Sequence, residues 1–323
     1  MILEPVSILP GLRNSPASMN WQLAKRQKAL WTRAKIVQGI RKSFIDRGYL
    51  EVETPQRIPA PAPESHIDAI PANGWFLHTS PELCMKRLLA AGYERIFQIC
   101  HCWREGERGN RHIPEFTLLE WYRIRTDYWG LMEETESLIQ SVVRAIGLTD
   151  RIVYQGKEIN LAGPWQRIAV REAFSRYAHI SMAEALELDR FDELMVQDIE
   201  PQLGIERPTF IYDYPAVRSS LARLRQDDPS VAERFELYIG GLELANGFSE
   251  LTDAKEQRAR FLHEEAYRRS LGKRPYPLPE KFLTELEMMP PSAGIALGID
   301  RLVMLLLDAA SIDEVVAFTT EEL

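Results

Sequence analysis

Cysteine is scarce in this sequence, with three residues among 323. Three thiols in a chain of this length cannot form the disulfide framework of a small secreted protein, so we expect a reducing compartment. Positive charge is also in deficit, because 39 lysine and arginine residues face 47 aspartate and glutamate residues, a formal net charge of −8. This balance argues against a protein whose main surface grips a nucleic-acid backbone, although it leaves a local basic patch open.

Long hydrophobic runs are missing as well. The most apolar segment, residues 302–310, is far shorter than the stretch of about 18 apolar residues that a membrane span requires. The amino terminus reads MILEPV, with no basic region before the apolar residues. No small-residue cleavage site follows, so it does not resemble a secretory signal. These features predict a cytoplasmic protein with no membrane partner.

The composition is otherwise ordinary, with 45% hydrophobic and 27% charged residues, as is typical of soluble globular proteins. The length allows one large domain or two ordinary ones. No internal repeat, low-complexity run or linker divides the chain. We therefore predict a single domain over residues 1–323, with residues 1–21 as an N-terminal extension.

Apolar periodicity, together with glycine and proline positions, predicts the secondary structure. Helices are expected over residues 22–47, 81–91, 129–146 and 252–271, and residues 166–200 are expected to be helical and peripheral. Strands are expected over residues 50–54, 96–104, 115–123, 235–246 and 294–298, with a hairpin turn at Gly240-Gly241. Antiparallel hairpins between helices indicate the α+β class, with an antiparallel β-sheet flanked by helices.

The first predicted hairpin carries polar side chains on one face. Because side chains alternate along a strand, Arg104 shares a face with Cys100 and Cys102, while His101 points the other way. The facing positions of the return strand are Phe116, Leu118, Glu120 and Tyr122. Unpaired polar groups are costly in a protein interior. The face is therefore either the floor of a binding site or a solvent-exposed surface with scattered polar residues.

The run Cys100-His101-Cys102 raises the question of a zinc site. A second pair of ligands is missing from the sequence around it, and the histidine lies on the face opposite to the cysteines. A metal site at this run is therefore not favoured.

The second predicted hairpin brings carboxylates together. With the turn at Gly240-Gly241, Tyr238 lies opposite Glu243 and Glu236 opposite Ala245, so the two glutamates become diagonal neighbours. Like charges this close repel unless a cation lies between them, and Mg²⁺ bound to phosphates is a suitable cation. The alternative is two exposed glutamates on an edge strand.

The third segment, residues 294–301, alternates small residues before a helix whose first turn carries Arg301. Glycine lets a ligand approach the backbone closely, and an arginine there can hold phosphate oxygens with two hydrogen bonds. A strand of small residues packed tightly under a helix would look the same, so this segment is a weak signal by itself.

Together, three segments resemble the three motifs of class II aminoacyl-tRNA synthetases. Residues 48–55 (GYLEVETP) are similar to motif 1, which forms the dimer interface in that family, and Arg104 with residues 112–116 (HIPEF) resembles motif 2. The segment that ends at Arg301 resembles motif 3. Residues 79–83 and 241–251 are similar to the lysyl-tRNA synthetase subgroup.

Two details resemble truncated paralogues within that subgroup, which attach (R)-β-lysine to a lysine of translation elongation factor P. Only some thirty residues precede the first catalytic helix, too few for the anticodon-binding barrel of a lysyl-tRNA synthetase, and Ala296 replaces a glycine of motif 3. The resemblance implies a homodimeric class II catalytic domain without anticodon binding. It also implies a ligase that activates (R)-β-lysine or lysine with ATP and transfers it to elongation factor P.

The resemblance also assigns residues to roles. Arg104 and Arg301 are implied as catalytic, Phe116 as the residue that stacks on adenine, and Glu236 and Glu243 as ligands of Mg²⁺. The implied ATP-binding residues are Arg104, Glu105, Gly106, His112, Ile113, Phe116, Glu243, Leu244, Gly298 and Arg301. The implied substrate-binding residues are Ser80, Pro81, Glu82, Tyr122, Asn246, Glu250 and Ala296.

The sequence departs from the family pattern at two positions. Gly106 stands where motif 2 carries a glutamate, with an acid one residue later at Glu107, and Ile113 stands where an asparagine is usual. Three other functions stay open at this stage: a minimal synthetase that charges tRNA, an inactive paralogue that acts as a binding module, and an asparagine-forming ligase.

Overall fold

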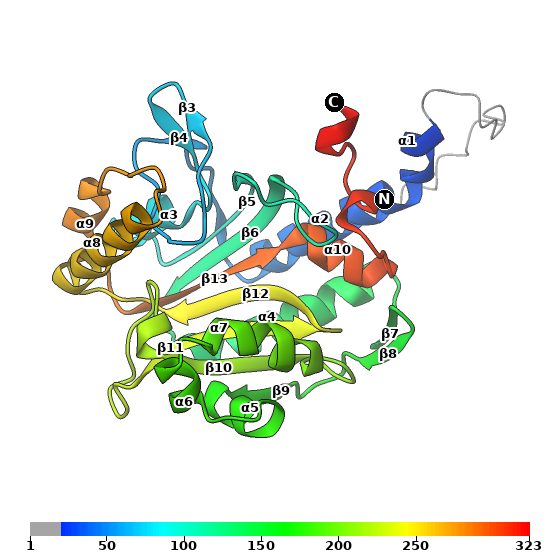
Figure 1. Ribbon diagram of the computed structural model, residues 1–323. Coiled ribbons are helices and arrows are strands. Elements are labelled where there is room, and N and C mark those ends of the chain that lie inside the picture. The colour runs from blue at the N-terminus through cyan, green and yellow to red at the C-terminus, as the bar shows by residue number, and fades with distance from the viewer. Residues whose placement is uncertain (1–20) are drawn as a thin grey trace.

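The computed structural model describes residues 21–323, and an eight-stranded β-sheet runs through the middle of the molecule (Figure 1). The strand order is β1-β5-β6-β13-β12-β11-β10-β9. The strands are β1 (Leu50–Glu51), β5 (Arg95–Trp103), β6 (Glu115–Ile124), β9 (Gln166–Ala169), β10 (Thr209–Pro215), β11 (Val231–Ile239), β12 (Leu242–Ser249) and β13 (Ser292–Gly298). Neighbouring strands from β5 to β10 are antiparallel, and the edge strands β1 and β9 pair in parallel with β5 and β10.

Helices cover the sheet on both sides, which confirms the predicted α+β class. The α-helices are α1 (Trp21–Lys25), α2 (Gln27–Asp46), α3 (Glu82–Ala90), α4 (Tyr128–Ala145), α5 (Val170–Tyr177), α6 (Met182–Glu187), α7 (Phe191–Leu194), α8 (Ala254–Ser270), α9 (Glu280–Leu286) and α10 (Ile299–Leu307). In Figure 1, α2 and α4 lie behind the sheet, while α5–α7 lie over one end of its front and α3, α8 and α9 over the other. The middle of the front face is left uncovered.

The smaller elements lie in the connections. Strands β2 (Arg57–Ile58), β3 (Pro71–Ala72) and β4 (Trp75–Leu77) form a three-stranded sheet, and β7 (Arg151–Tyr154) and β8 (Lys157–Asn160) form a hairpin. The short helical turns are η1 (Met195–Ile199), η2 (Glu200–Gln202), η3 (Ala216–Arg218), η4 (Ile312–Glu314) and η5 (Thr320–Glu322). Among the described residues, no helix is both long and apolar enough to cross a bilayer.

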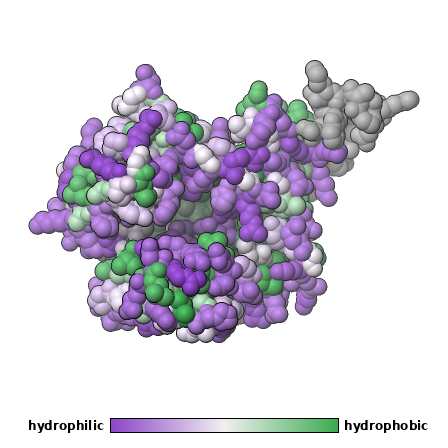
Figure 2. Space-filling view, viewed as in Figure 1, coloured by the Kyte–Doolittle hydropathy of each residue, from purple (hydrophilic) through white to green (hydrophobic). Residues whose placement is uncertain are grey.

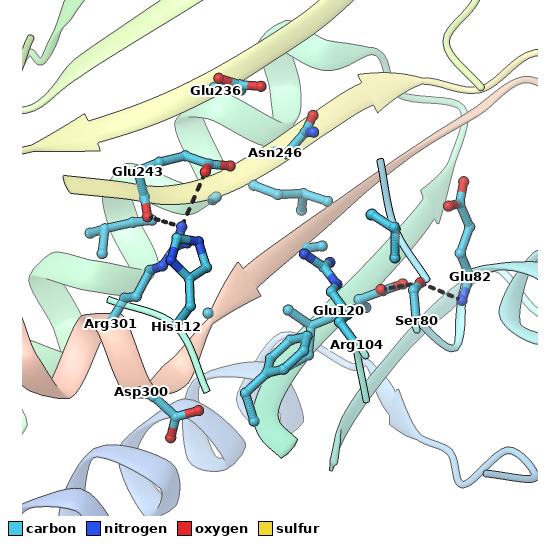
Figure 3. A pocket seen from close by; sticks show the side chains of 18 of the residues that line it. Ser80, Glu82, Arg104, His112, Glu120, Glu236, Glu243, Asn246, Asp300 and Arg301 are labelled. Atoms are coloured by element: carbon cyan, nitrogen blue, oxygen red, sulfur yellow. Dashed lines mark hydrogen bonds and ion pairs between the residues drawn. The ribbon is translucent and has the colours of Figure 1, made fainter. Parts of the chain in front are cut away.

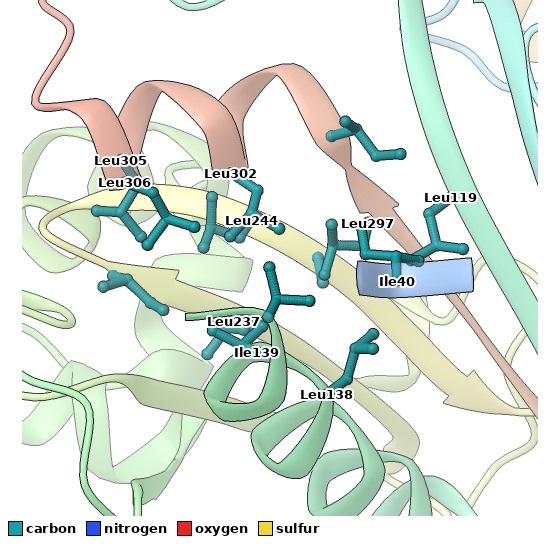
Figure 4. Close-up of a cluster of buried hydrophobic side chains, with 14 of the residues drawn as sticks. Ile40, Leu119, Leu138, Ile139, Leu237, Leu244, Leu297, Leu302, Leu305 and Leu306 are labelled. Atoms are coloured by element: carbon teal, nitrogen blue, oxygen red, sulfur yellow. The ribbon is translucent and has the colours of Figure 1, made fainter. Parts of the chain in front are cut away.

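The largest hydrophobic cluster lies behind the sheet and joins it to α4 and α10 (Figure 4). Leu138 and Ile139 of α4 belong to it, and the buried positions of that helix recur with helical spacing. From the sheet, β13 contributes Ile295 and Leu297, which alternate with smaller residues. Because a strand places successive side chains on opposite faces, those smaller residues of β13 point to the uncovered front face.

Most predicted elements are confirmed, with small shifts at their ends. The helix expected over residues 22–47 is divided into α1 and α2 at Arg26, and Gly48 follows it with a φ of +75°, which glycine adopts at no steric cost. The strand expected over residues 50–54 is reduced to β1. Strands β7, β8 and β10 and helix α9 were not predicted.

Two predictions are wrong. Residues 166–200 are not helical throughout, because Gln166–Ala169 form β9, a four-residue strand that exists through its pairing with β10. In the second hairpin, Tyr238 does lie opposite Glu243, but a register shift beyond it places Glu236 opposite Asn246 instead of Ala245. A β-bulge of this kind changes the register without leaving a regular sequence pattern.

Gly247 of β12 tests the close packing between the sheet and its core. A Cβ added there would lie 2.7 Å from Phe235 Cζ and 2.9 Å from Ile295 Cβ. We expect Gly247→Ala to lower the free energy of unfolding by about 1–3 kcal/mol, measured by urea denaturation. Gly39→Ala in α2 is the matched control, since its Cβ would make an ordinary 3.5 Å contact with Ala145. It should raise stability by about 0.5–1 kcal/mol, and a neutral Gly247→Ala would contradict the packing argument.

Candidate active site

A large cavity opens on the uncovered middle of the sheet, and Figure 2 shows the hollow on this face. Its volume of about 360 Å³ lies within the range of small-molecule sites. Its walls come from β6, β11, β12 and β13, from the residues between β5 and β6, from the segment before α3 and from the start of α10. The first hairpin face is therefore the floor of a cavity, not an exposed surface.

The structure brings most of the sequence-predicted residues together around this cavity. Those that line it are Ser80, Glu82, Arg104, His112, Ile113, Phe116, Tyr122, Glu236, Glu243, Leu244, Asn246, Ala296, Gly298 and Arg301. Four predicted residues do not line it. Pro81 caps the start of α3, Glu105 and Gly106 are exposed in the turn after β5, and Glu250 is buried deeper.

Arg301 at the start of α10 is fixed by two neighbours at one end of the cavity (Figure 3). Its Nη1 donates to the carbonyl oxygen of Glu243 at 2.9 Å and to its carboxylate at 3.1 Å. Its Nη2 lies 2.6 Å from Nε2 of His112. Burial, together with the nearby Arg301 charge, lowers the pKa of His112, so the neutral ring accepts this hydrogen bond.

Arg104 lies at the other side of the floor and faces an aromatic ring. Its guanidinium carbon is 4.9 Å from the ring centre of Phe116, within the range of a cation–π contact. Its Nη1 is 3.7 Å from Glu107, so the acid that the sequence shifts by one position still reaches this arginine. Its buried Nε has no hydrogen-bond partner among the described residues. Arg111 and Arg234 also line the cavity, which makes this part a site for an anion.

Glu120 lies at the opposite end of the cavity from Arg301 (Figure 3). Its side chain accepts hydrogen bonds from Ser80 Oγ at 2.6 Å and from the Tyr122 hydroxyl at 2.8 Å. Burial, with a further effect of Glu82, raises its pKa to about 8. An uncompensated buried acid of this kind favours a bound cation, because the cation lowers the cost of ionising it.

The sequence did not point to Lys86, although its positive charge offsets the carboxylates at this end of the cavity. Its Nζ is buried and lies 2.5 Å from carboxylate oxygens of both Glu82 and Glu250. Burial lowers the pKa of Lys86, but the two carboxylates outweigh that effect and the amine stays charged. The i,i+4 spacing of Glu82 and Lys86 on α3 could have indicated the first contact. Glu250 therefore supports Lys86 from behind the cavity wall instead of lining it.

Carboxylates also gather near the end of the cavity formed by β11 and β12. Glu236 accepts hydrogen bonds from Arg234 at 2.7 Å, from Tyr214 at 2.6 Å and from Tyr238 at 2.9 Å. Burial and the charges of Glu236 and Glu243 raise the pKa of Glu200 to about 7. The pKa values of Glu200 and Glu236 are both raised, in part by the charge of Glu243, so this group of carboxylates is a suitable place for a divalent cation between them and a phosphate.

Two further acids of the cavity were missed because their neighbours come from distant segments. Glu64 lies in the proline-rich segment after β2, and burial raises its pKa to about 7. Asp300 accepts from Arg33 of α2 at 2.5 Å and from the backbone N–H of Thr117 at 2.7 Å, and so anchors the start of α10 to β6. No local sequence pattern signals either contact.

Comparison with known proteins assigns the family. A model of the family described as tRNA synthetases class II (D, K and N) matches residues 12–322. The chain therefore belongs to the class II tRNA synthetase family, which agrees with its α+β fold.

Within that class, the similar curated proteins are named elongation factor P–(R)-β-lysine ligase. The one from Proteus mirabilis is 40% identical over 316 residues, which cover 93% of this chain and 97% of the relative. The one from Mannheimia succiniciproducens is 42% identical over 313 residues, covering 92% and 97%. The one from Edwardsiella ictaluri is 41% identical over 320 residues, covering 94% and 98%.

The raised pKa of Glu120 predicts a pH dependence of stability. A carboxyl whose pKa is higher in the folded than in the unfolded state stabilises the fold while protonated, and this stabilisation is lost as the pH rises toward 8. Relative to Glu120→Gln, the wild type should lose up to about 2–3 kcal/mol between pH 6 and 8, by 1.36 kcal/mol per unit.

Denaturant unfolding of both proteins without ligand across this range measures the difference. Glu133→Gln, at an exposed position of α4, is the matched control and should follow the wild type. Parallel curves for the wild type and Glu120→Gln would show that Glu120 is ionised throughout.

Proposed function

We propose that this chain is an ATP-dependent ligase that activates (R)-β-lysine or lysine as an adenylate and transfers it to a lysine side chain of elongation factor P. The observation that carries the proposal is the division of one cavity into an arginine-rich part and an acidic end. A triphosphate suits the first and an amino acid with two ammonium groups suits the second. The names of the relatives support the same acceptor and amino acid.

The reaction has two steps in this proposal. The amino-acid carboxylate attacks the α-phosphorus of ATP and pyrophosphate leaves. The amine of the acceptor lysine then attacks the activated carbonyl and AMP leaves. The first step needs close positioning and charge neutralisation more than acid–base groups, and the cavity offers fixed arginines for this purpose.

We assign the nucleotide to the arginine-rich part. Arg104 would hold the carboxylate and the α-phosphate, Phe116 would stack on adenine and Arg301 would hold the terminal phosphates. The other residues of this part are His112, Ile113, Leu244 and Gly298, whereas Glu105 and Gly106 lie outside the cavity in the turn after β5. Glu236 and Glu243 would hold Mg²⁺, whose charge would offset that of the phosphates.

We assign the amino acid to the acidic end. Ser80, Glu82, Tyr122 and Asn246 line it, with Pro81 at the start of α3 and Glu250 behind Lys86. Ala296 of β13 lies between Asn246 of β12 and Glu120 of β6 in the sheet register. Its methyl group therefore stands between two polar side chains that could receive ammonium groups.

Ala296 is therefore proposed to select between lysine isomers. One extra methyl group in a close-fitting pocket changes discrimination by about 1–3 kcal/mol. We expect Ala296→Gly to gain about tenfold or more in kcat/KM for α-lysine over (R)-β-lysine, measured by ATP–pyrophosphate exchange with each isomer. No gain on α-lysine would remove this residue as the selector.

Arg301 tests the assignment of the nucleotide. Arg301→Lys keeps one positive charge but loses the contact of two guanidinium N–H groups with phosphate oxygens. We expect the rate of ATP–pyrophosphate exchange to fall by about 10²–10³-fold, as for loss of one charge-stabilising donor. Arg258→Lys on the exposed surface of α8, where this arginine pairs with Glu280, is the matched control and should keep full exchange. Equal rates in both variants would place the phosphates elsewhere.

A minimal synthetase that charges tRNA is the main rival. The two functions share the adenylate step and differ only in the acceptor. Charging of tRNA supplied as the sole acceptor would support the rival, whereas exchange without charging favours a protein acceptor. Failure of exchange with every amino acid would favour an inactive binding module.

We further propose that the chain, as a single catalytic domain, forms a homodimer through α2 and β1. Trp31 and Ile45 of α2 are 61% and 60% exposed, and Leu50 of β1 is 49% exposed. Trp31 and Ile45 are about four turns apart at 3.6 residues per turn, so both face the same side. Such an exposed apolar surface favours a partner.

Light scattering tests the dimer. The wild type should show twice the chain mass, and the double variant Trp31→Glu, Ile45→Glu should shift toward the monomer. Val217→Glu, at a residue that is 69% exposed on another surface, should leave the mass unchanged. A wild-type monomer at micromolar concentration would contradict the proposal.

A further inference from the structure

A cluster of soft ligands lies beside the floor of the cavity, on the same face of the sheet. Cys100 and Cys102 point to the same face of β5, as their alternation predicts, and His78 approaches them from the segment between β4 and α3. All three are buried, with 8%, 0% and 1% of their surfaces exposed. One ligand atom from each lies within 4.8 Å of the other two.

The prediction that His101 points away from the two cysteines is confirmed, since His101 is exposed and pairs with Glu115 at 2.7 Å. The sequence does not favour a metal site here, because a second pair of ligands is missing around the run and His101 points away from the cysteines. The fold supplies a third ligand from twenty-two residues away, which no spacing rule for the Cys-His-Cys run could indicate.

The distances between the ligand atoms match tetrahedral coordination of one ion. The two sulfur atoms are 3.9 Å apart, and Cys102 Sγ is 3.9 Å from His78 Nε2. With zinc bonds of about 2.3 Å to sulfur and about 2.0 Å to nitrogen, tetrahedral angles give separations of about 3.8 Å between the sulfur atoms and about 3.5 Å between sulfur and nitrogen. These two separations need to change by only a few tenths of an ångström, and the remaining pair, Cys100 and His78, lies within 4.8 Å.

A disulfide between the same cysteines is disfavoured by the strand. Residues two apart on an extended strand are about 6.6 Å apart at Cα, near the upper limit for a disulfide, and their side chains run parallel. The sulfur separation of 3.9 Å is also far from a bond.

We propose that His78, Cys100 and Cys102 form a binding site for one Zn²⁺ ion. Two thiolates and a neutral imidazole cancel the charge of the ion, as a buried site requires. Leu118, Phe116 and Ala296 pack against the two cysteines, and the Gln98 side chain is within hydrogen-bonding reach of Cys100. Three protein ligands leave the fourth coordination position open to water.

Binding follows a definite exchange of protons. Both thiols release their protons to solvent, and the imidazole moves its proton from Nε2 to Nδ1. The hydrogen bond that Nε2 now makes with the carbonyl oxygen of His101 at 2.8 Å is replaced by the bond to zinc. No oxidant or reductant is needed.

The site would tie the segment before α3 to the sheet. His78 is two residues before Ser80, which donates a hydrogen bond to Glu120 in the acidic end of the cavity. Phe116 and Ala296, which line the cavity, pack against the cysteines. An ion here would therefore fix the position of Ser80 without touching the cavity contents.

Metal titration of the full, reduced and metal-stripped chain tests the proposal. Zn²⁺ in competition with a chromophoric chelator should bind with one equivalent per chain and raise the melting temperature. Co²⁺ in its place should give the near-ultraviolet charge-transfer absorption of thiolate ligands. Cys102→Ser and His78→Gln should weaken binding by more than the roughly 10–100-fold that loss of a supporting residue costs.

Cys84→Ser is the matched control, because Cys84 lies on α3 outside the cluster, and it should bind like the wild type. X-ray absorption of the zinc-loaded wild type gives an answer even if a variant does not fold, and it should count two sulfur ligands. Substoichiometric binding, a zinc shell without sulfur, unchanged affinity in Cys102→Ser, or a mass two hydrogens lower from a disulfide would each overturn the proposal.

Discussion

The alternation of side chains along the central strands is the constraint on which the rest of the structure depends. Strand β13 shows it most clearly, because Ile295 and Leu297 enter the core behind the sheet while Gly294 and Ala296 face the cavity in front. The two sets cannot be exchanged, since a one-residue slip would turn every side chain to the other face. A Cβ at Gly294 would also lie 2.1 Å from the Tyr122 ring, so the same strand sets how close the cavity walls come.

Charge is separated along the cavity that this alternation creates. Arg301 and Arg104 are held by side chains that do not fully neutralise them, while Glu120 is buried and, within residues 21–323, is bonded to Ser80 and Tyr122 and to no cationic side chain. The chain as a whole carries a net charge of −8, so the arginines act through local placement. The buried ion pairs of Lys86 stabilise the acidic end, because Glu82 and Glu250 would otherwise repel each other and their neighbours. This division is what suits the cavity to a phosphate anion and a diamino acid at once.

Much of this could be predicted from the sequence, because hairpins and glycine turns leave local signals. The hairpin faces of Arg104 and Glu243, and the short strand before Arg301, follow from alternation alone. The bulge in β12 and the strand β9 could not be predicted, since each is defined by its pairing and not by its own pattern. Two residues that come from loops could not be predicted either: Glu64, which lines the cavity, and His78, which lies beside Cys100 and Cys102. A family resemblance supplied the roles of residues that the physical pattern only grouped together.

The acceptor decides between the proposed ligase and a tRNA-charging enzyme, and intact-mass spectrometry of elongation factor P identifies it. Purified elongation factor P is incubated with this protein, ATP and Mg²⁺ and with either (R)-β-lysine or α-lysine, while a parallel reaction contains tRNA in its place. The account predicts a mass increase of one lysyl group on elongation factor P, larger in yield with (R)-β-lysine, and no charged tRNA. An unchanged mass with both isomers, in an enzyme preparation that performs ATP–pyrophosphate exchange, would contradict it.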